Sequence, residues 1–159
     1  MKVGFVGWRG MVGSVLMKRM EEESDFNYLP ERTFFSTSQV GEMGPDVAGG
    51  QFLEDANSLV VLKKCDIIVT CQGGGWTSEI HPQLRNDGWK GIWIDTASTL
   101  RMEKDSIIVL DPLNREMIET GLKKGIKDFV GGNCTASVML MSCHGLFKKN
   151  LVEWVNSMT

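Results

Sequence analysis

Val3-Gly4-Phe5-Val6 runs directly into Gly7-Trp8-Arg9-Gly10-Met11-Val12-Gly13, and this stretch decides the fold. The apolar run predicts a buried strand, and the residues from Met11 to Glu23 predict a helix. The first glycine allows a sharp turn, the second lets the backbone approach a phosphate, and the third lets the helix pack closely on the strand. A helix N-terminus offers free N–H groups and partial positive charge, so the turn predicts a pyrophosphate site. A glycine-rich turn that serves packing alone is the alternative.

The rest of the chain repeats this alternation of short apolar runs and amphipathic stretches. Val12, Leu16 and Met20 are expected on the inner face of the first helix. Further strands are predicted at 33–36, 66–70, 92–95, 107–110 and 128–130, and helices over 58–63, 77–86, 114–124 and 135–147, with a glycine-rich loop at 41–50. Strands that are apolar on both faces and alternate with helices indicate a parallel sheet. We therefore expect a Rossmann-like, doubly wound α/β fold, with a mostly parallel sheet and helices on both faces.

Composition excludes several other classes of protein. The 159 residues suffice for one ordinary domain, and 42% hydrophobic with 23% charged residues is typical of a globular chain. A net charge of −3 argues against a nucleic-acid groove, and no apolar run approaches the ~20 residues that span a bilayer. The start of the chain does not resemble a signal peptide, so we expect a reducing, cytoplasmic compartment without disulfides. Four cysteines without a C-x-x-C pair, and only two histidines, give poor support for a metal site.

The end of the second predicted strand bears on the choice of cofactor. NAD sites place an Asp or Glu there to hold the ribose hydroxyls, whereas this strand ends in Ser36-Thr37-Ser38-Gln39. Small hydroxyls and free backbone N–H groups can bind a 2′-phosphate, with Arg9 as an extra cation, so the sequence predicts NADP. A polar loop that merely ends a strand is the alternative. After the third strand, Cys71-Gln72-Gly73-Gly74-Gly75 predicts either a cofactor contact through Gln72 or a simple flexible turn.

A candidate nucleophile lies in Gly131-Gly132-Asn133-Cys134-Thr135, between the last strand and an apolar helix. The dipole at a helix N-terminus stabilises a thiolate, and the two glycines allow another group to come close. A thiolate beside a nicotinamide suits acyl chemistry, although a buried structural cysteine remains the alternative. His144 lies about 15 Å along the same helix and cannot act as the base. His81 is expected to serve at the surface or as a helix cap.

These stretches, together with Phe34-Phe35-Ser36-Thr37-Ser38-Gln39, Thr70-Cys71-Gln72-Gly73-Gly74 and Phe129-Val130-Gly131-Gly132-Asn133-Cys134-Thr135, closely resemble aspartate-β-semialdehyde dehydrogenase of the Gram-negative bacterial type. The resemblance runs over nearly the whole chain and is most specific around Cys134. It implies reduction of aspartyl β-phosphate by NADPH to aspartate β-semialdehyde and phosphate. This step belongs to the biosynthesis of lysine, methionine and threonine.

The resemblance also implies roles for individual residues. Cys134 would form the acyl thioester, and Arg101, with Asn133, would hold the substrate phosphate. The fork of an arginine pairs with oxyanions two at a time, which suits that role. The residues implied or expected to bind NADP are Gly7, Arg9, Gly10, Met11, Val12, Gly13, Thr37, Ser38 and Gln72.

Length departs from the family, whose members are more than twice as long. We therefore expect residues 1–133 to form an NADP-binding domain and residues 134–159 to begin a truncated catalytic and dimerisation domain, with 151–155 as its first strand. The general base would lie outside this chain, and the complete enzyme would be a homodimer acting on a small molecule, without nucleic acid or membrane. An N-acetylglutamyl-phosphate reductase and a stand-alone nucleotide-binding module without catalysis remain alternatives.

Overall fold

The computed structural model describes residues 1–158. The strands are β1 (Lys2–Val6), β2 (Glu31–Ser36), β3 (Glu54–Asp55), β4 (Ile67–Thr70), β5 (Ile92–Asp95), β6 (Ser106–Val109) and β7 (Asp128–Gly131). The α-helices are α1 (Met11–Glu22), α2 (Leu59–Leu62), α3 (Gly74–Asn86), α4 (Arg115–Lys123) and α5 (Cys134–Lys148). Two short 3-10 helices, η1 (Asp25–Tyr28) and η2 (Asp46–Ala48), flank β2. No helix of residues 1–158 is long and apolar enough to cross a membrane.

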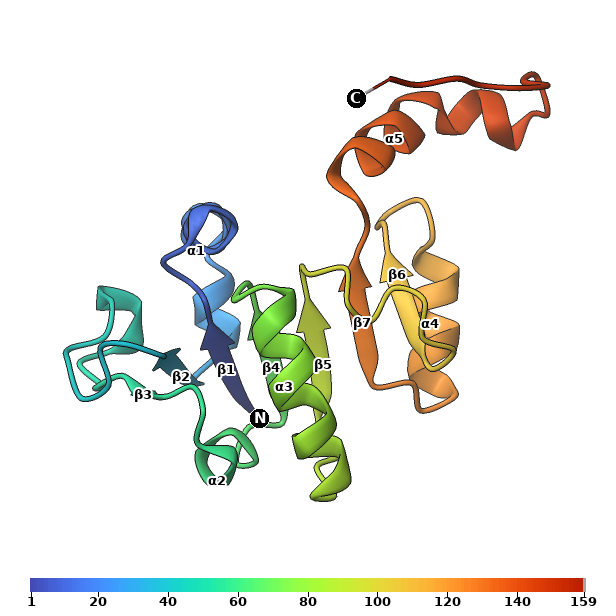
Figure 1. Cartoon of the computed structure of the whole chain (residues 1–159). Helices are drawn as coiled ribbons and strands as arrows, with labels where there is room; N and C mark the ends of the chain where they lie inside the picture. Colours follow the sequence, from blue (N-terminus) through green and yellow to red (C-terminus); the bar gives the residue numbers. More distant parts are fainter. Residues whose placement is uncertain (159) are drawn as a thin grey trace.

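The strands form one sheet in the order β3-β2-β1-β4-β5-β7-β6, and every strand pairing in it is parallel (Figure 1). Phe5 of β1 pairs with Phe34 of β2 on one side and with Val69 of β4 on the other. The chain therefore winds one way from β1 to β3 and the other way from β4 onward. The predicted Rossmann-like, doubly wound fold is confirmed. Because the strand order reverses between β1 and β4, ligands of such a sheet bind at the carboxyl ends of these two strands.

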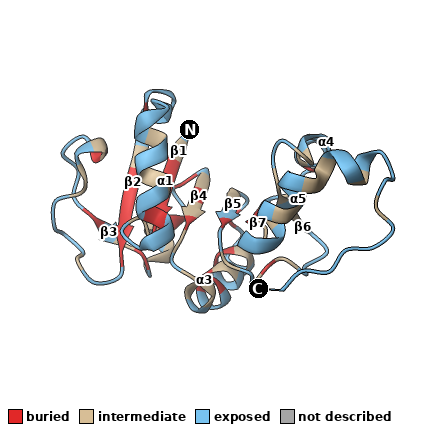
Figure 2. Cartoon of the chain, turned by 90° about the horizontal axis from the view of Figure 1, so that it is seen from above, coloured by how far each residue is buried: buried red, intermediate tan, exposed pale blue. Residues whose placement is uncertain are grey.

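Two helices cover each face of the sheet. On one face, α2 and α3 pack over a core centred on Trp93, which is fully buried among Ile68, Ile80 and Leu84. On the other face, α1 packs through Met17 and Met20 on a core that contains Phe5 and Phe34. The α4 helix lies against β6, where Gly121 faces Ile107. Figure 1 shows α3 in front of the sheet, and Figure 2 shows buried residues concentrated on the strands β1 and β2 and beside α3.

An apolar groove remains on the face that carries α1 and α4. Its floor includes Val69, Ile94 and Phe129, and its volume is about 460 Å³. Ile94 is 38% exposed although it lies in the middle of the sheet. Helices therefore cover this face less completely than the sequence predicts.

Several predicted details of the chain are wrong. The third helix begins at Gly74 rather than Thr77, because glycines have low helix propensity and conceal its first turn. Val12 was predicted on the inner face of α1 but is 49% exposed. The region 41–50 contains η2, and β3 was not predicted at all. Two residues are too few to produce a detectable alternation.

The last part of the described chain stands apart from the sheet. The helix α5 rises above the carboxyl ends of β6 and β7 and contains no buried residue, and the tail after it runs back in the opposite direction (Figures 1 and 2). The predicted strand at 151–155 is not present, since these residues pair with no strand among residues 1–158 and the backbone bends at Glu153. A strand requires a hydrogen-bonded neighbour, and this segment has none there.

Candidate functional site

The turn between β1 and α1 requires glycine at two positions. Gly7 has φ of +71°, and a Cβ there would lie 2.4 Å from the backbone nitrogen of Gln72. A Cβ on Gly13 would lie 2.2 Å from the carbonyl oxygen of Gly7 and 2.6 Å from the Cα of Trp8. The sharp turn and the close packing of α1 expected from the spacing are therefore both present. The turn also touches the loop after β4, as the strand order demands.

Gly10 differs, because the protein itself leaves room for a side chain there. A Cβ built on Gly10 would have only one neighbouring atom within 4 Å, the Gly7 oxygen at 3.4 Å. The φ of Gly10 is −67°, which suits any residue. Gly10 is the N-cap of α1, and the amides that follow it, at Met11, Val12 and Gly13, have no intrahelical acceptor. Free amides at the N-terminus of a twelve-residue helix suit an anionic group.

A cleft of about 620 Å³ opens at this turn. It is lined by Gly7, Trp8, Arg9, Gly10, Phe35, Ser36, Thr37, Ser38, Gln39, Cys71 and Gln72. Six predicted residues are among them, namely Gly7, Arg9, Gly10, Thr37, Ser38 and Gln72. Met11, Val12 and Gly13 are not; Met11 is 86% exposed on the first turn of α1. Arg9 is the one Lys, Arg, Asp or Glu in the lining among the residues described.

Ser36, at the end of β2, is the hydrogen-bonding centre of the cleft and was missed as a site residue. Its hydroxyl oxygen accepts hydrogen bonds from Arg9 Nη2 at 2.8 Å, from the amide of Gln39 at 2.9 Å and from that of Ser38 at 3.2 Å. The expectation of free backbone N–H groups here is therefore wrong for these two amides. The side-chain hydroxyls of Thr37 and Ser38 and the remaining donors of Arg9 are left for a ligand.

The turn after β4 leads directly into α3. Gly73, with φ of +101°, is the N-cap of α3, and the amide of Gln72 donates to the hydroxyl of Thr70 at 3.2 Å. Cys71 lines the cleft, and burial raises the pKa of its thiol. Burial also raises the pKa of Cys65, to about 11, so both thiols are protonated near neutral pH.

Cys134 is exposed and is the first residue of α5. Asn133 is the N-cap, and its side-chain oxygen accepts a hydrogen bond from the amide of Ala136 at 3.0 Å. An asparagine before an apolar helix is a usual N-cap, so the sequence carried this signal. A Cβ at Gly132 would lie 2.6 Å from the hydroxyl of Ser137, which shows how closely the loop approaches the helix. The thiol of Cys134 is therefore exposed in residues 1–158, and its role as a nucleophile stays a prediction.

Arg101 lies beside the same loop. Its Nε donates to the carbonyl oxygen of Gly131 at 2.8 Å and its Nη2 to that of Gly132 at 3.1 Å. These carbonyls belong to the residues just before Asn133 and Cys134. The structure therefore brings Arg101 to the loop that leads to Asn133 and Cys134, which follow it by 32 and 33 residues in the chain. Arg101 is half-buried, and from the sequence alone it resembles an ordinary surface cation.

A buried carboxylate at the end of β5 supports the segment that leads to Arg101. Asp95 is 1% exposed and accepts hydrogen bonds from the Thr77 hydroxyl at 2.6 Å, the Trp93 indole at 3.2 Å and the Ala97 amide at 2.7 Å. These bonds hold α3 and the loop after β5 to the same group. A buried carboxylate needs such partners, because leaving it unpaired costs several kcal/mol.

Neither histidine lies near Cys134. His144 is on α5, ten residues further along, which corresponds to about 15 Å. His81 is not at a helix start or on the surface, as was expected, but within α3, where its Nε2 lies 3.1 Å from Asp128 Oδ1. Burial alone would raise the pKa of Asp128, but hydrogen bonds from His81 and Arg85 outweigh it and hold this pKa below its usual range. Asp128 begins β7, at the edge of the sheet opposite Cys134.

The cleft and Cys134 share the carboxyl edge of the sheet. β1 and β7 are three strand spacings apart in the sheet, about 14 Å. The glycine turn, the free amides of α1 and the cleft between β1, β2 and β4 fit a dinucleotide, whose pyrophosphate would lie at α1. The other half of such a ligand can extend along this edge toward Cys134.

Comparison with known proteins agrees with this geometry. Residues 2–121 match the family model described as semialdehyde dehydrogenase, NAD binding domain. The structure of aspartate semialdehyde dehydrogenase from Francisella tularensis is 54% identical, with a TM-score of 0.93, over 97% of this chain and 42% of that one. Aspartate semialdehyde dehydrogenase II from Vibrio cholerae, complexed with ASA, shares the fold at 19% identity, with a TM-score of 0.71 over 92% of this chain and 46% of that one. A Candida albicans aspartate semialdehyde dehydrogenase structure with NADP shares it at 15% identity, with a TM-score of 0.63 over 93% and 47%.

The chain thus spans less than half the length of these relatives. The match to the NAD-binding domain covers most of it, and the predicted resemblance is confirmed. The chain belongs to the semialdehyde dehydrogenase family.

Proposed function

We propose that this chain is the cofactor-binding portion and nucleophile segment of an enzyme that reduces aspartyl β-phosphate to aspartate β-semialdehyde and phosphate with NADPH. One observation carries the proposal: Cys134 is exposed at the first residue of α5, on the sheet edge that also holds the dinucleotide cleft. The 54% identity to an aspartate semialdehyde dehydrogenase favours an aspartyl phosphate over other acyl phosphates.

The cleft favours NADP over NAD. Its lining, among the residues described, has no carboxylate to repel a 2′-phosphate or to hold a free ribose hydroxyl. Arg9 and the hydroxyls of Thr37 and Ser38 can donate to a phosphate. Two or three charge-assisted hydrogen bonds of about 1.5–3 kcal/mol each would give at least a tenfold preference.

In the proposed reaction, the thiolate of Cys134 attacks the acyl carbon of the substrate. The new C–S bond forms as the C–O bond to phosphate breaks, and phosphate leaves with the electron pair. Arg101 and Asn133 lie beside Cys134. The Nη1 of Arg101 forms no hydrogen bond within residues 1–158, so it can donate hydrogen bonds to the leaving phosphate. Bound NADPH would supply the hydride that reduces the thioester, and the aldehyde then leaves as the thiolate of Cys134 is restored.

The division of the chain into residues 1–133 and 134–159 is part of the proposal. All seven strands belong to the first part, and α5 in the second buries none of its residues. An apolar helix of this kind is usually covered in a folded protein. Since His81 and His144 are both distant from Cys134, we propose that the group that transfers protons during catalysis lies outside these 159 residues.

Calorimetric titration of this chain tests the cofactor site. NADPH should bind at least ten times more tightly than NADH, and Arg9→Ala should reduce that ratio. Gln83→Ala, a surface change on α3 away from the cleft, should leave both affinities unchanged. Equal affinities of the wild-type chain for the two nucleotides would refute the proposed selectivity.

The catalytic part is tested by phosphate-dependent reduction of NADP with aspartate semialdehyde, the reverse reaction. The 159-residue chain should bind NADP without useful turnover, because proton transfer is typically worth 10²–10⁴-fold and orientation can be worth more. Turnover like that of an ordinary dehydrogenase, abolished by Cys134→Ala, would show that these residues suffice and would refute the proposed division.

A further inference from the structure

The side chain of Ser36 accepts more hydrogen bonds than the end of a strand requires. It is 3% exposed, and its hydroxyl accepts from three donors that belong to different parts of the cleft. Two of them are amides of the following loop, so Ser36 curls that loop back over the end of β2. The third is the guanidinium of Arg9, which comes from the turn after β1, 27 residues earlier.

Arg9 is thereby held in a defined place by neighbouring side chains of the protein itself. One of its nitrogens is bonded to Ser36, and its Cζ lies 5.2 Å from the centre of the Trp8 ring. The indole of Trp8 in turn donates to the carbonyl oxygen of Phe35 at 3.1 Å. Two successive residues of the glycine turn are thus tied to two successive residues of β2. A guanidinium has five N–H donors, so the bond to Ser36 leaves others for a ligand.

We infer that Ser36 is a positioning residue that determines selectivity for 2′-phosphorylated nucleotides. Its hydroxyl holds Arg9 in the arrangement that receives the phosphate, next to the loop of Thr37 and Ser38. An arginine fixed in advance loses less conformational freedom on binding than a mobile surface arginine. This inference rests on the proposed NADP site and assigns its selectivity to a residue whose own side chain is buried.

The test uses 2′,5′-ADP and 5′-AMP, which share the adenosine and the 5′-phosphate and differ in the 2′-phosphate. In the wild-type chain, calorimetry should show tighter binding of 2′,5′-ADP, by about tenfold or more. Ser36→Ala should bring the ratio of the two affinities close to one, while the affinity for 5′-AMP stays within about twofold. Preserved 5′-AMP binding also shows that the variant is folded. Ser36→Cys, nearly isosteric but a weak acceptor, should lose the preference in the same way.

Two further comparisons separate positioning from a general effect on β2. Thr33→Ala removes a buried hydroxyl from the same strand, away from the cleft, and should keep the wild-type ratio. In an Arg9→Ala background, the effect of Ser36→Ala on the ratio should be much smaller, because the side chain that Ser36 holds is gone.

The outcomes distinguish the proposed NADP selectivity from the positioning role of Ser36. A wild-type chain that binds both ligands equally would refute the proposed NADP selectivity and the inference with it. A wild-type preference that survives both Ser36→Ala and Ser36→Cys would refute the inference alone. Equal losses from Ser36→Ala in the wild-type and Arg9→Ala backgrounds would also refute it, because Ser36 would then not act through Arg9.

Discussion

Replacing Gly13 with alanine should destabilise the protein, because the new methyl group would clash with the backbone of the β1–α1 turn. The added Cβ would lie 2.2 Å from the Gly7 oxygen and 2.6 Å from the Cα of Trp8, and both are backbone atoms. Since real Cβ contacts stay above 3.0 Å, α1 and the turn must separate by about 0.8 Å. Overpacking of this kind costs typically about 1–3 kcal/mol, beyond the helix propensity that alanine gains.

Thermal unfolding of Gly13→Ala and two matched variants checks the argument. For a chain of this length each kcal/mol corresponds to about 2–4 °C, so the melting temperature of Gly13→Ala should fall measurably. Gly75→Ala, in α3 with no atom within 4 Å of the new Cβ, should melt at or slightly above the wild-type temperature. Gly10→Ala should lose less stability than Gly13→Ala, because its Cβ would meet only the Gly7 oxygen, at 3.4 Å, and the remaining cost is that of alanine at an N-cap.

Affinity for NADPH should reveal a role of Gly10 that differs from the packing role of Gly13. Gly10→Ala should bind NADPH about tenfold or more weakly although it loses less stability than Gly13→Ala, because its methyl group would project where the backbone must approach the phosphates. The reasoning is refuted if Gly13→Ala melts like the wild type. It is refuted equally if Gly10→Ala binds NADPH with wild-type affinity.

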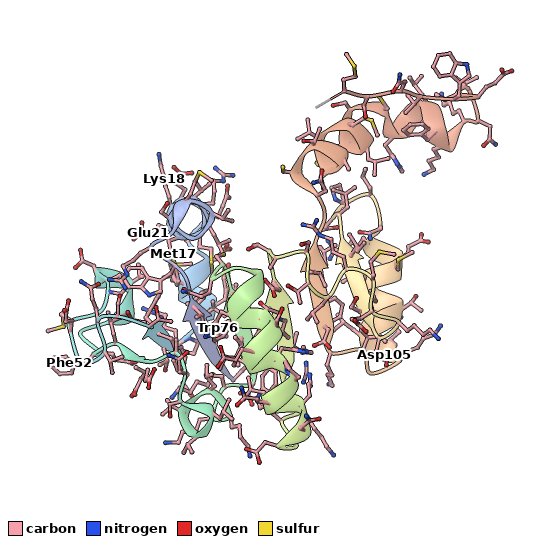
Figure 3. All side chains as sticks on the ribbon, viewed as in Figure 1. Met17, Lys18, Glu21, Phe52, Trp76 and Asp105 are labelled. Atoms are coloured by element: carbon pink, nitrogen blue, oxygen red, sulfur yellow. The ribbon has the colours of Figure 1, made fainter. Side chains whose placement is uncertain are left out.

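Three other predictions concern the thiols, an ion pair and a buried indole. A limiting dose of iodoacetamide at neutral pH, followed by peptide mapping, should label Cys134 before Cys65, whose pKa burial raises to about 11; earlier labelling of Cys65 would contradict the assignment. The lowered pKa of Asp128 means that its stabilising contribution is complete above the ordinary value of 3.8 and is lost as the pH falls through the folded-state pKa. The stability of Asp128→Asn should therefore fall less steeply than that of the wild type between pH 5 and pH 2 in urea titrations, and parallel curves would contradict this. Trp76, on α3 (Figure 3), stacks on Trp93, but its indole N–H is buried without a partner in residues 1–158. Trp76→Phe should therefore lower the melting temperature less than Trp93→Phe does, and the opposite order would contradict this.

Local patterns in the sequence were enough to predict the order and type of most elements. Glycine spacing at 7, 10 and 13 after an apolar run predicts a strand, a turn and a helix, because each glycine answers a local steric need. Errors arose where the local signal is weak or misleading. The glycines at 73–75 concealed the start of α3, and the apolar run at 151–155 resembles a strand but has no neighbour in residues 1–158.

The sequence by itself determined the fold class, the glycine turn after β1, the position of Cys134 at the start of a helix and the absence of an acid at the end of β2. Only the tertiary structure decided which side chains act together. It placed Arg101 against the loop before Cys134, Arg9 on the hydroxyl of Ser36, and His81 beside Asp128 rather than on the surface. These contacts join residues 27 to 47 positions apart. The parallel sheet creates the first two by bringing the ends of separate strands to its carboxyl edge, and the third arises where α3 meets the start of β7 at the opposite edge. Sequence periodicity carries no information about such pairs, because each partner satisfies its own local pattern whether or not the other is present.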